Sequence, residues 1–156
     1  MVIYEDTRQQ KNKHRNIHAY CKQHGIEIIR QGLNVGDYML AGPCGGGISV
    51  DTKYGVPELA GNVFQDHDRF RDECLRAKKC GIQLYVLTEE VPPGGRLENW
   101  RSPIGWDGLP MHKFKPDVLR KTLITMQEEY GVRFYFCRPE DTGMWLIRLL
   151  EGKIMK

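Results

Sequence analysis

The sequence predicts an α/β fold in which a mixed β-sheet is flanked by helices. Three short strand-like segments follow one another early in the chain, and later strands alternate with helices. The expected order is β-α-β-β-β-α-β followed by α-β-α, which is typical of a mixed sheet with helices on its faces. A length of 156 residues suits a single core, so we expect residues 1–156 to form one domain.

The first half of the chain alternates apolar runs with turn residues. Strands are predicted where β-branched or aromatic residues lie between turns, and a helix where a polar run lacks proline and glycine. In chain order these elements are a strand at 2–4, a helix at 8–24, and strands at 26–30, 38–40 and 48–51. Turn residues at 34–37 precede the third strand, and the glycines of residues 42–47 connect it to the fourth.

The second half alternates helices with strands of the kind that are buried on both faces. Pro57 fits a first helical turn, and Gly61 with Asn62 suggests a break before a longer helix. Pro116 opens another helix, whose apolar residues recur at core spacing. The predicted elements are helices from 57 and over 64–79, a strand at 82–87, a helix at 116–130, a strand at 132–137 and a helix at 139–150. Residues 91–114 are expected to be irregular, with room for one short helix.

Composition and charge argue against several classes of protein. No apolar run approaches the roughly 20 residues of a membrane span, and the N-terminus lacks a signal-peptide pattern. We therefore expect a cytoplasmic or intracellular protein without membrane contact and without an organic cofactor. The five cysteines are odd in number and irregularly spaced, which argues against a disulfide framework and a zinc site. The net charge of +3 permits nucleic acid as a partner, and basic residues cluster at 11–15 and 69–79.

Three acidic residues lie where strands end or turns begin, namely Asp6, Asp37 and Asp51. Lys53 follows the last of them by two residues, and residues i and i+2 of a strand point to the same face. If Asp37 joins them from the neighbouring hairpin strand, two carboxylates and an ammonium converge. Carboxylates bind Mg²⁺, a bound metal activates water and neutralises phosphate charge, and a lysine stabilises the same charge. The grouping therefore predicts hydrolysis of phosphodiesters.

The same residues resemble the signature of the XPF-type nuclease domain, within the PD-(D/E)XK nuclease superfamily. That signature is an early D-x-R-E, then G-D, then E-R-K-x-x-x-D. Its three parts correspond to Asp6-Thr7-Arg8-Gln9, to Gly36-Asp37 and to Asp51-Thr52-Lys53, with Glu58 one residue late for the terminal acid. Gln9 stands where the family has an acid, Asp51 where it has Glu, and Thr52 where it has Arg.

The resemblance implies a restriction-endonuclease-like fold and a metal-dependent DNA endonuclease. Mg²⁺ or Mn²⁺ would be bound by Asp6, Asp37 and Asp51, and Lys53 would act with Asp37 and Asp51 in catalysis, supported by Glu58. The residues expected to contact DNA are Arg8, Gln65, His67, Arg69 and Arg71. The resemblance also implies branched or flapped DNA in repair or recombination, a homodimer formed through the helices after residue 115, and a stand-alone domain of bacterial or phage origin.

Each candidate residue also has a purely structural interpretation. Asp6 would cap the following helix, Asp37 would form a turn, and Asp51 with Lys53 would be a surface ion pair. The structural alternatives for the others are a first-turn acid for Glu58, a local ion pair for Arg8, and a solvated helix face for Gln65, His67 and Arg69. For the whole chain, the alternatives are a catalytically inactive DNA-binding module of the same fold and a protein-interaction subunit.

Overall fold

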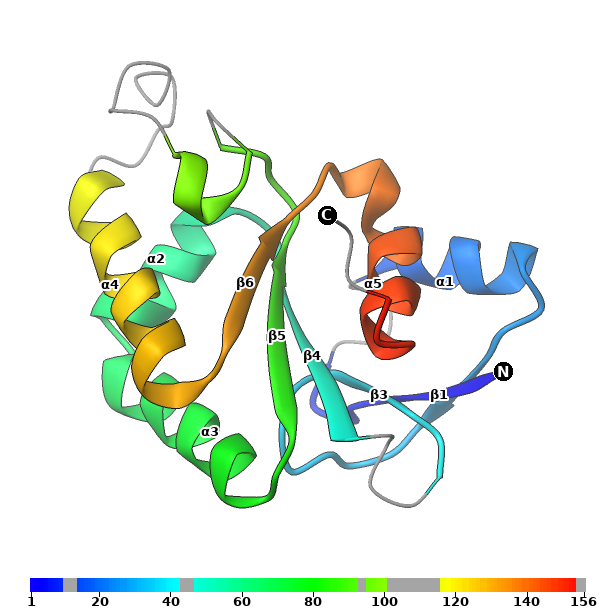
Figure 1. Ribbon diagram of the computed structural model, residues 1–156. Coiled ribbons are helices and arrows are strands. Elements are labelled where there is room, and N and C mark those ends of the chain that lie inside the picture. The colour runs from blue at the N-terminus through cyan, green and yellow to red at the C-terminus, as the bar shows by residue number, and fades with distance from the viewer. Residues whose placement is uncertain (10–13, 43–46, 93–94, 101–115, 154–156) are drawn as a thin grey trace.

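The computed structural model describes residues 1–9, 14–42, 47–92, 95–100 and 116–153 (Figure 1). These residues form a six-stranded sheet in the order β2-β1-β3-β4-β5-β6. The strands are β1 (Val2–Glu5), β2 (Glu27–Arg30), β3 (Tyr38–Leu40), β4 (Ile48–Lys53), β5 (Gln83–Thr88) and β6 (Arg133–Phe136). β3 is antiparallel to both β1 and β4. β2 runs parallel to β1. The strands β4, β5 and β6 run parallel to one another. The predicted mixed sheet is confirmed.

Helices cover both faces of this sheet. They are α1 (Arg15–Gln23), α2 (Val56–Phe64), α3 (His67–Lys79), α4 (Pro116–Tyr130) and α5 (Thr142–Leu150), with 3-10 turns η2 (Leu97–Asn99) and η3 (Pro139–Asp141). Figure 1 shows α2, α3 and α4 on one side and α1 and α5 on the other. The core has two parts accordingly: Leu59, Phe70 and Leu123 pack on the first side, and Ile17 and Leu146 on the second. No helix among the described residues has the length and apolar character needed to cross a membrane.

The strand directions bring the predicted site residues to one edge of the sheet. Because β1 and β4 are both antiparallel to β3, they end at the edge where β3 begins. Asp6 directly follows β1, Asp37 directly precedes β3, and Asp51 and Lys53 lie at the end of β4. The N–H of Asp6 donates to the carbonyl oxygen of Asp37 at 2.8 Å, and the N–H of Asp37 donates to that of Val50 at 2.9 Å. The backbone ladder therefore continues into the site and fixes it.

Gly36 makes the turn that leads into β3. Its φ of +70° lies in the left-handed region that favours glycine. A Cβ atom at this position would overlap Oγ of Ser49 and lie 3.2 Å from the carbonyl oxygen of Val50. The glycine before Asp37 is therefore required both by the backbone conformation and by the close approach of β4.

Several helix boundaries differ from the sequence prediction. The helix predicted over 64–79 begins at His67, because a turn and a bend at residues 65 and 66 separate it from α2. α1 begins at Arg15 and not at residue 8, since residues 7–9 form turns and a bend. The predicted break at Gly61 and Asn62 is wrong: α2 continues to Phe64, because burial of Leu59 and Val63 outweighs the low helix propensity of glycine. The last helix begins at Thr142, after the 3-10 turn at 139–141. In the stretch predicted to be irregular, the one short helix is η2, and residues 93–94 and 101–114 lie outside the described residues. Residues 10–13 of the predicted first helix and residues 43–46 of the predicted glycine-rich connection also lie outside them.

Candidate active site

Asp37 and Asp51 are brought together from the start of β3 and the end of β4. Burial, together with the neighbouring charge of Asp51, raises the pKa of Asp37 well above its usual range. Asp51 is 5% exposed, and its Oδ2 atom is paired with the ammonium of Lys53 at 2.9 Å. Two adjacent buried carboxylates repel each other when both are ionised, so this pair favours a shared proton or a bound cation.

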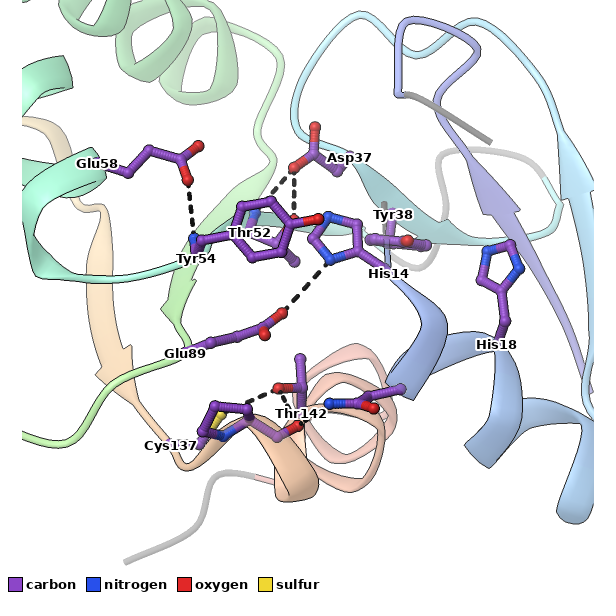
Figure 2. A network of polar contacts seen from close by, with 12 residues as sticks. His14, His18, Asp37, Tyr38, Thr52, Tyr54, Glu58, Glu89, Cys137 and Thr142 are labelled. Atoms are coloured by element: carbon purple, nitrogen blue, oxygen red, sulfur yellow. Dashed lines mark hydrogen bonds and ion pairs between the residues drawn. The ribbon is translucent and has the colours of Figure 1, made fainter. Parts of the chain in front are cut away.

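Thr52 holds one oxygen of Asp37. The backbone N–H and the hydroxyl of Thr52 both donate to Oδ2 of Asp37, each at 2.9 Å. Figure 2 shows the other oxygen of Asp37 pointing away from Thr52. Thr52 therefore fixes the orientation in which Asp37 presents its second oxygen.

Lys53 reaches Asp51, as the two-residue spacing on a strand predicts. Its Nζ atom lies 2.9 Å from Oδ2 of Asp51 and donates to Oδ1 of Asn62 at 3.4 Å. Burial disfavours the charged ammonium, but the carboxylates of Asp51 and Asp37 outweigh it, so the pKa of Lys53 lies above its ordinary value. Lys53 is therefore a charged hydrogen-bond donor and not a base.

A third carboxylate, Glu73 of α3, faces the same place. Burial, followed by the charge of Asp51, raises the pKa of Glu73 to about 7, although Lys53 and a hydrogen bond from the N–H of Gly36 oppose the shift. The cleft between these residues has a volume of about 470 Å³. Its acidic and cationic lining residues are Asp6, Asp37, Asp51, Glu73, Arg8, Lys53, Arg69 and Arg76.

Asp6 lines this cleft with both of its oxygens already hydrogen-bonded. Oδ1 accepts from the N–H of Leu33 at 3.0 Å, and Oδ2 accepts from Nε of Arg8 at 2.7 Å. The local ion pair considered for Arg8 is thus present, while the Arg8 side chain stays 63% exposed at the cleft. The helix-cap alternative for Asp6 is wrong, because α1 begins at Arg15. Asp6 as a metal ligand stays a prediction.

The donor set fits a hard divalent cation. Mg²⁺ is usually bound by one or two carboxylates and keeps several of its waters. Among the described residues, no group of three or more His, Cys, Asp or Glu side chains is arranged to hold a metal ion. The buried carboxylates of Asp37 and Asp51 lie next to each other in the cleft, and they match a two-carboxylate site completed by water.

The sequence matches the family model described as the ERCC4 domain over residues 6–149. The chain belongs to the ERCC4 domain family. Two solved structures share the fold of this ERCC4 domain: XPF from Aeropyrum pernix, with a TM-score of 0.66, and XPF from Aeropyrum pernix in complex with DNA, with a TM-score of 0.65. Each is 18% identical to the chain and covers 96% or 97% of it, whereas the chain spans 64% of the length of each. No curated protein sequence shows a significant match. The resemblance to XPF-type nuclease domains and the predicted fold class are both confirmed.

The predicted DNA contacts of this ERCC4 domain divide between the cleft and its surroundings. Arg8 and Arg69 line the cleft. Gln65, His67 and Arg71 are not among its lining residues. Nδ1 of His67 lies 3.2 Å from the carbonyl oxygen of Val63, and Arg71 pairs with Asp68 at 3.6 Å, which favours the solvated helix face for these two residues.

Glu58 lies in the first turn of α2, outside the cleft lining. Its Oε2 atom accepts a hydrogen bond from the backbone N–H of Tyr54 at 2.9 Å, which holds the segment that follows Lys53. Its charge also contributes to the raised pKa of Lys53. The expected supporting role of Glu58 stays a prediction, and these contacts give it a physical basis.

Asn62, Glu73 and Arg76 line the cleft of this ERCC4 domain but were not selected as site residues from the sequence. A signal for Glu73 and Arg76 existed, because they follow Arg69 at i+4 and i+7 beside the apolar stripe that begins at Phe70. A polar stripe bordering a buried one is typical of a helix that flanks a cleft. Asn62 could not be recognised as a site residue, because the sequence pattern placed it at a helix break and not within α2.

Proposed function

We propose that this ERCC4 domain is a metal-dependent DNA endonuclease that hydrolyses phosphodiester bonds. The observation that carries the proposal is the convergence of Asp37, Asp51 and Lys53 in one cleft lined by further cations. Carboxylates alone would repel the phosphates of DNA. A divalent cation bound by Asp37 and Asp51 would remove this repulsion, and the arginines that line the cleft would attract the phosphates. The burial of Asp51 and Lys53 also argues against the alternative in which they form only a surface ion pair.

Asp37 and Asp51 are suited to hold Mg²⁺ or Mn²⁺, which lowers the pKa of a coordinated water and neutralises phosphate charge. The ammonium of Lys53, kept charged by its neighbours, donates toward the oxygen on which negative charge develops. Arg8 and Arg69 contact flanking phosphates and so position the backbone without reading the sequence.

The substrate class that we propose is branched or flapped DNA in repair or recombination, with a homodimer as the working form. Membership of the ERCC4 domain family supports DNA as the partner. One of the structures that share the fold, XPF from Aeropyrum pernix, is in complex with DNA. Selectivity for a branch rather than for a base sequence is consistent with cleft cations that contact phosphates.

The decisive experiment is cleavage of labelled duplex, flap, fork and four-way-junction DNA with Mg²⁺, with Mn²⁺ and with EDTA. We expect cleavage with either metal, none in EDTA, and recovery when excess metal is restored. Asp51→Asn should abolish cleavage while DNA affinity persists or rises, because the change removes negative charge near the phosphate. Cleavage that persists in EDTA would contradict the metal requirement. Binding without cleavage under every condition would favour the inactive module.

A further inference from the structure

A buried histidine lies behind Asp37 and is connected to it through Thr52. His14 is 4% exposed and directly precedes α1. Its Nε2 atom lies 2.9 Å from Oγ1 of Thr52, and its Nδ1 atom lies 3.4 Å from Oε1 of Glu89, the residue after β5. Figure 2 shows the contact between Glu89 and His14 and the two contacts between Thr52 and Asp37, with the ring of Tyr54 in front of Thr52.

The direction of the hydrogen bonds follows from the number of protons. A threonine hydroxyl has a single proton, and that of Thr52 is donated to Oδ2 of Asp37. The backbone N–H of Thr52 donates to the same oxygen, which marks Oδ2 as an acceptor. Oγ1 of Thr52 must therefore accept from His14, so Nε2 of His14 carries a proton. The two hydrogen bonds from His14 to Thr52 and from Thr52 to Asp37 therefore both point toward Asp37.

The imidazole ring is held firmly in this position. Its centroid lies 6.0 Å from that of Tyr38, in an edge-on arrangement, and 5.4 Å from that of Tyr54. The carbonyl oxygen of His14 accepts the N–H of His18 at 3.1 Å, which joins the backbone of His14 to the start of α1. Nδ1 of His14 makes no hydrogen bond with the residues that the structure describes, so the buried ring depends on the contact of Nε2 with Thr52.

We propose that His14 is a positioning residue of the metal site. It holds the Thr52 hydroxyl in the rotamer that donates to Asp37, and Oε1 of Glu89 lies 3.4 Å from Nδ1 on the other side of the ring. Thr52 occupies the position where the XPF-type signature has Arg, so this chain orients its carboxylate through a relay from α1. The inference rests on the proposed function, since it takes Asp37 as a metal ligand.

The test is the Mn²⁺ affinity of the full chain, measured by calorimetry without DNA. Thr52→Val removes the hydroxyl at nearly constant shape, and His14→Phe removes the donor but keeps a ring. Each should weaken Mn²⁺ binding about tenfold, as loss of a group that orients a ligand typically does. Because both act through one hydrogen bond to Asp37, the double variant should also be about tenfold weaker, and not about a hundredfold. Thr52→Ser should restore most of the affinity, and His18→Phe, in the helix that follows His14, should leave it unchanged.

A second measurement is independent of metal. In ¹⁵N NMR of the imidazole rings, Nε2 of His14 should carry a proton, and both Thr52→Val and Asp37→Asn should shift its resonance while that of His18 stays in place. Additive losses of Mn²⁺ affinity, or native affinity in Thr52→Val, would overturn the relay. An unprotonated Nε2 would overturn it as well. If the native chain bound no Mn²⁺, the proposed function would fail, and the NMR result would still decide whether the relay exists. If His14→Phe fails to fold, Thr52→Val carries the test.

Discussion

The Nζ atom of Lys53 lies 2.9 Å from Oδ2 of Asp51, and the two side chains are 10% and 7% exposed. The same Nζ atom lies 5.8 Å from the ring centroid of Phe70, so α3 closes over the pair. A buried ion pair is weak evidence for stability, because desolvation offsets the attraction. Its consequence here is chemical: a positive charge is held in place beside the paired carboxylates.

Loss of the Lys53 ammonium should reduce chemistry more than binding. Lys53→Ala should lower the cleavage rate by about a hundredfold or more, about 2.7 kcal/mol, because the charge acts where negative charge develops in the transition state. DNA affinity, measured with Ca²⁺ at one salt concentration, should fall much less. Lys22→Ala, on the exposed face of α1, should cleave at the native rate. Equal losses of rate and affinity would instead make Lys53 a binding residue.

Glu73 should make the metal-free protein less stable as the pH rises. Its pKa is about 7 in the folded chain, above the ordinary value of 4.5, so folding takes up a proton between these two values. The stabilisation is complete below the unfolded pKa and is lost as the pH rises through the folded one. Glu73→Gln should therefore lose less stability than the native chain between about pH 5 and about pH 8.

We expect the difference in this pH dependence to reach about 1 kcal/mol or more, or a few degrees in melting temperature. Thermal unfolding in EDTA across this range measures it. Asp72→Asn, on the exposed side of α3, provides the matched control and should follow the native curve. If Glu73→Gln also follows the native curve, Glu73 does not hold a proton in the folded state.

Gly36→Ala should destabilise the fold and disturb Asp37 together. The residue has φ of +70°, and a Cβ atom would overlap Oγ of Ser49, so both strain and a clash follow. We expect a loss of about 2 kcal/mol or more in urea unfolding. Gly25→Ala has a similar φ of +67° but meets nothing within 4 Å, so it should cost about 1 kcal/mol. Equal losses in the two variants would show that the approach of Ser49 is unimportant.

Local periodicity predicted the part of the site that lies on the strands. The shared face of Asp51 and Lys53 follows from the two-residue repeat of a strand, and the approach of Asp37 follows from the hairpin. Glu73 could not be placed in this way, because the rotation of α3 depends on packing such as that of Phe70 against Phe134, whose ring centroids are 6.4 Å apart.

The contact between His14 and Thr52 could not be predicted from local sequence patterns either. The two residues are separated by 38 positions, and the contact depends on where α1 begins. Polar residues at 8–14 match a helix locally, but the turn after β1 is stabilised by tertiary contacts, such as the 2.7 Å hydrogen bond from Arg8 to the carbonyl oxygen of Leu33. The sequence pattern does not encode those contacts.

Residues on the cleft face of α3 should contact the phosphates of the DNA backbone, and residues on its outer face should not. Arg69 and Arg76 line the cleft, whereas Arg71 is paired with Asp68 outside it. Arg69→Gln and Arg76→Gln should each weaken binding to all sequences alike and reduce the slope of log affinity against log salt by about one. The measurement uses the Asp51→Asn background, so that DNA stays intact. Arg71→Gln removes the same charge from the same helix and should leave the slope unchanged. A smaller slope in Arg71→Gln, with no change in the other two, would place the DNA on the outer face of α3 and away from the carboxylates.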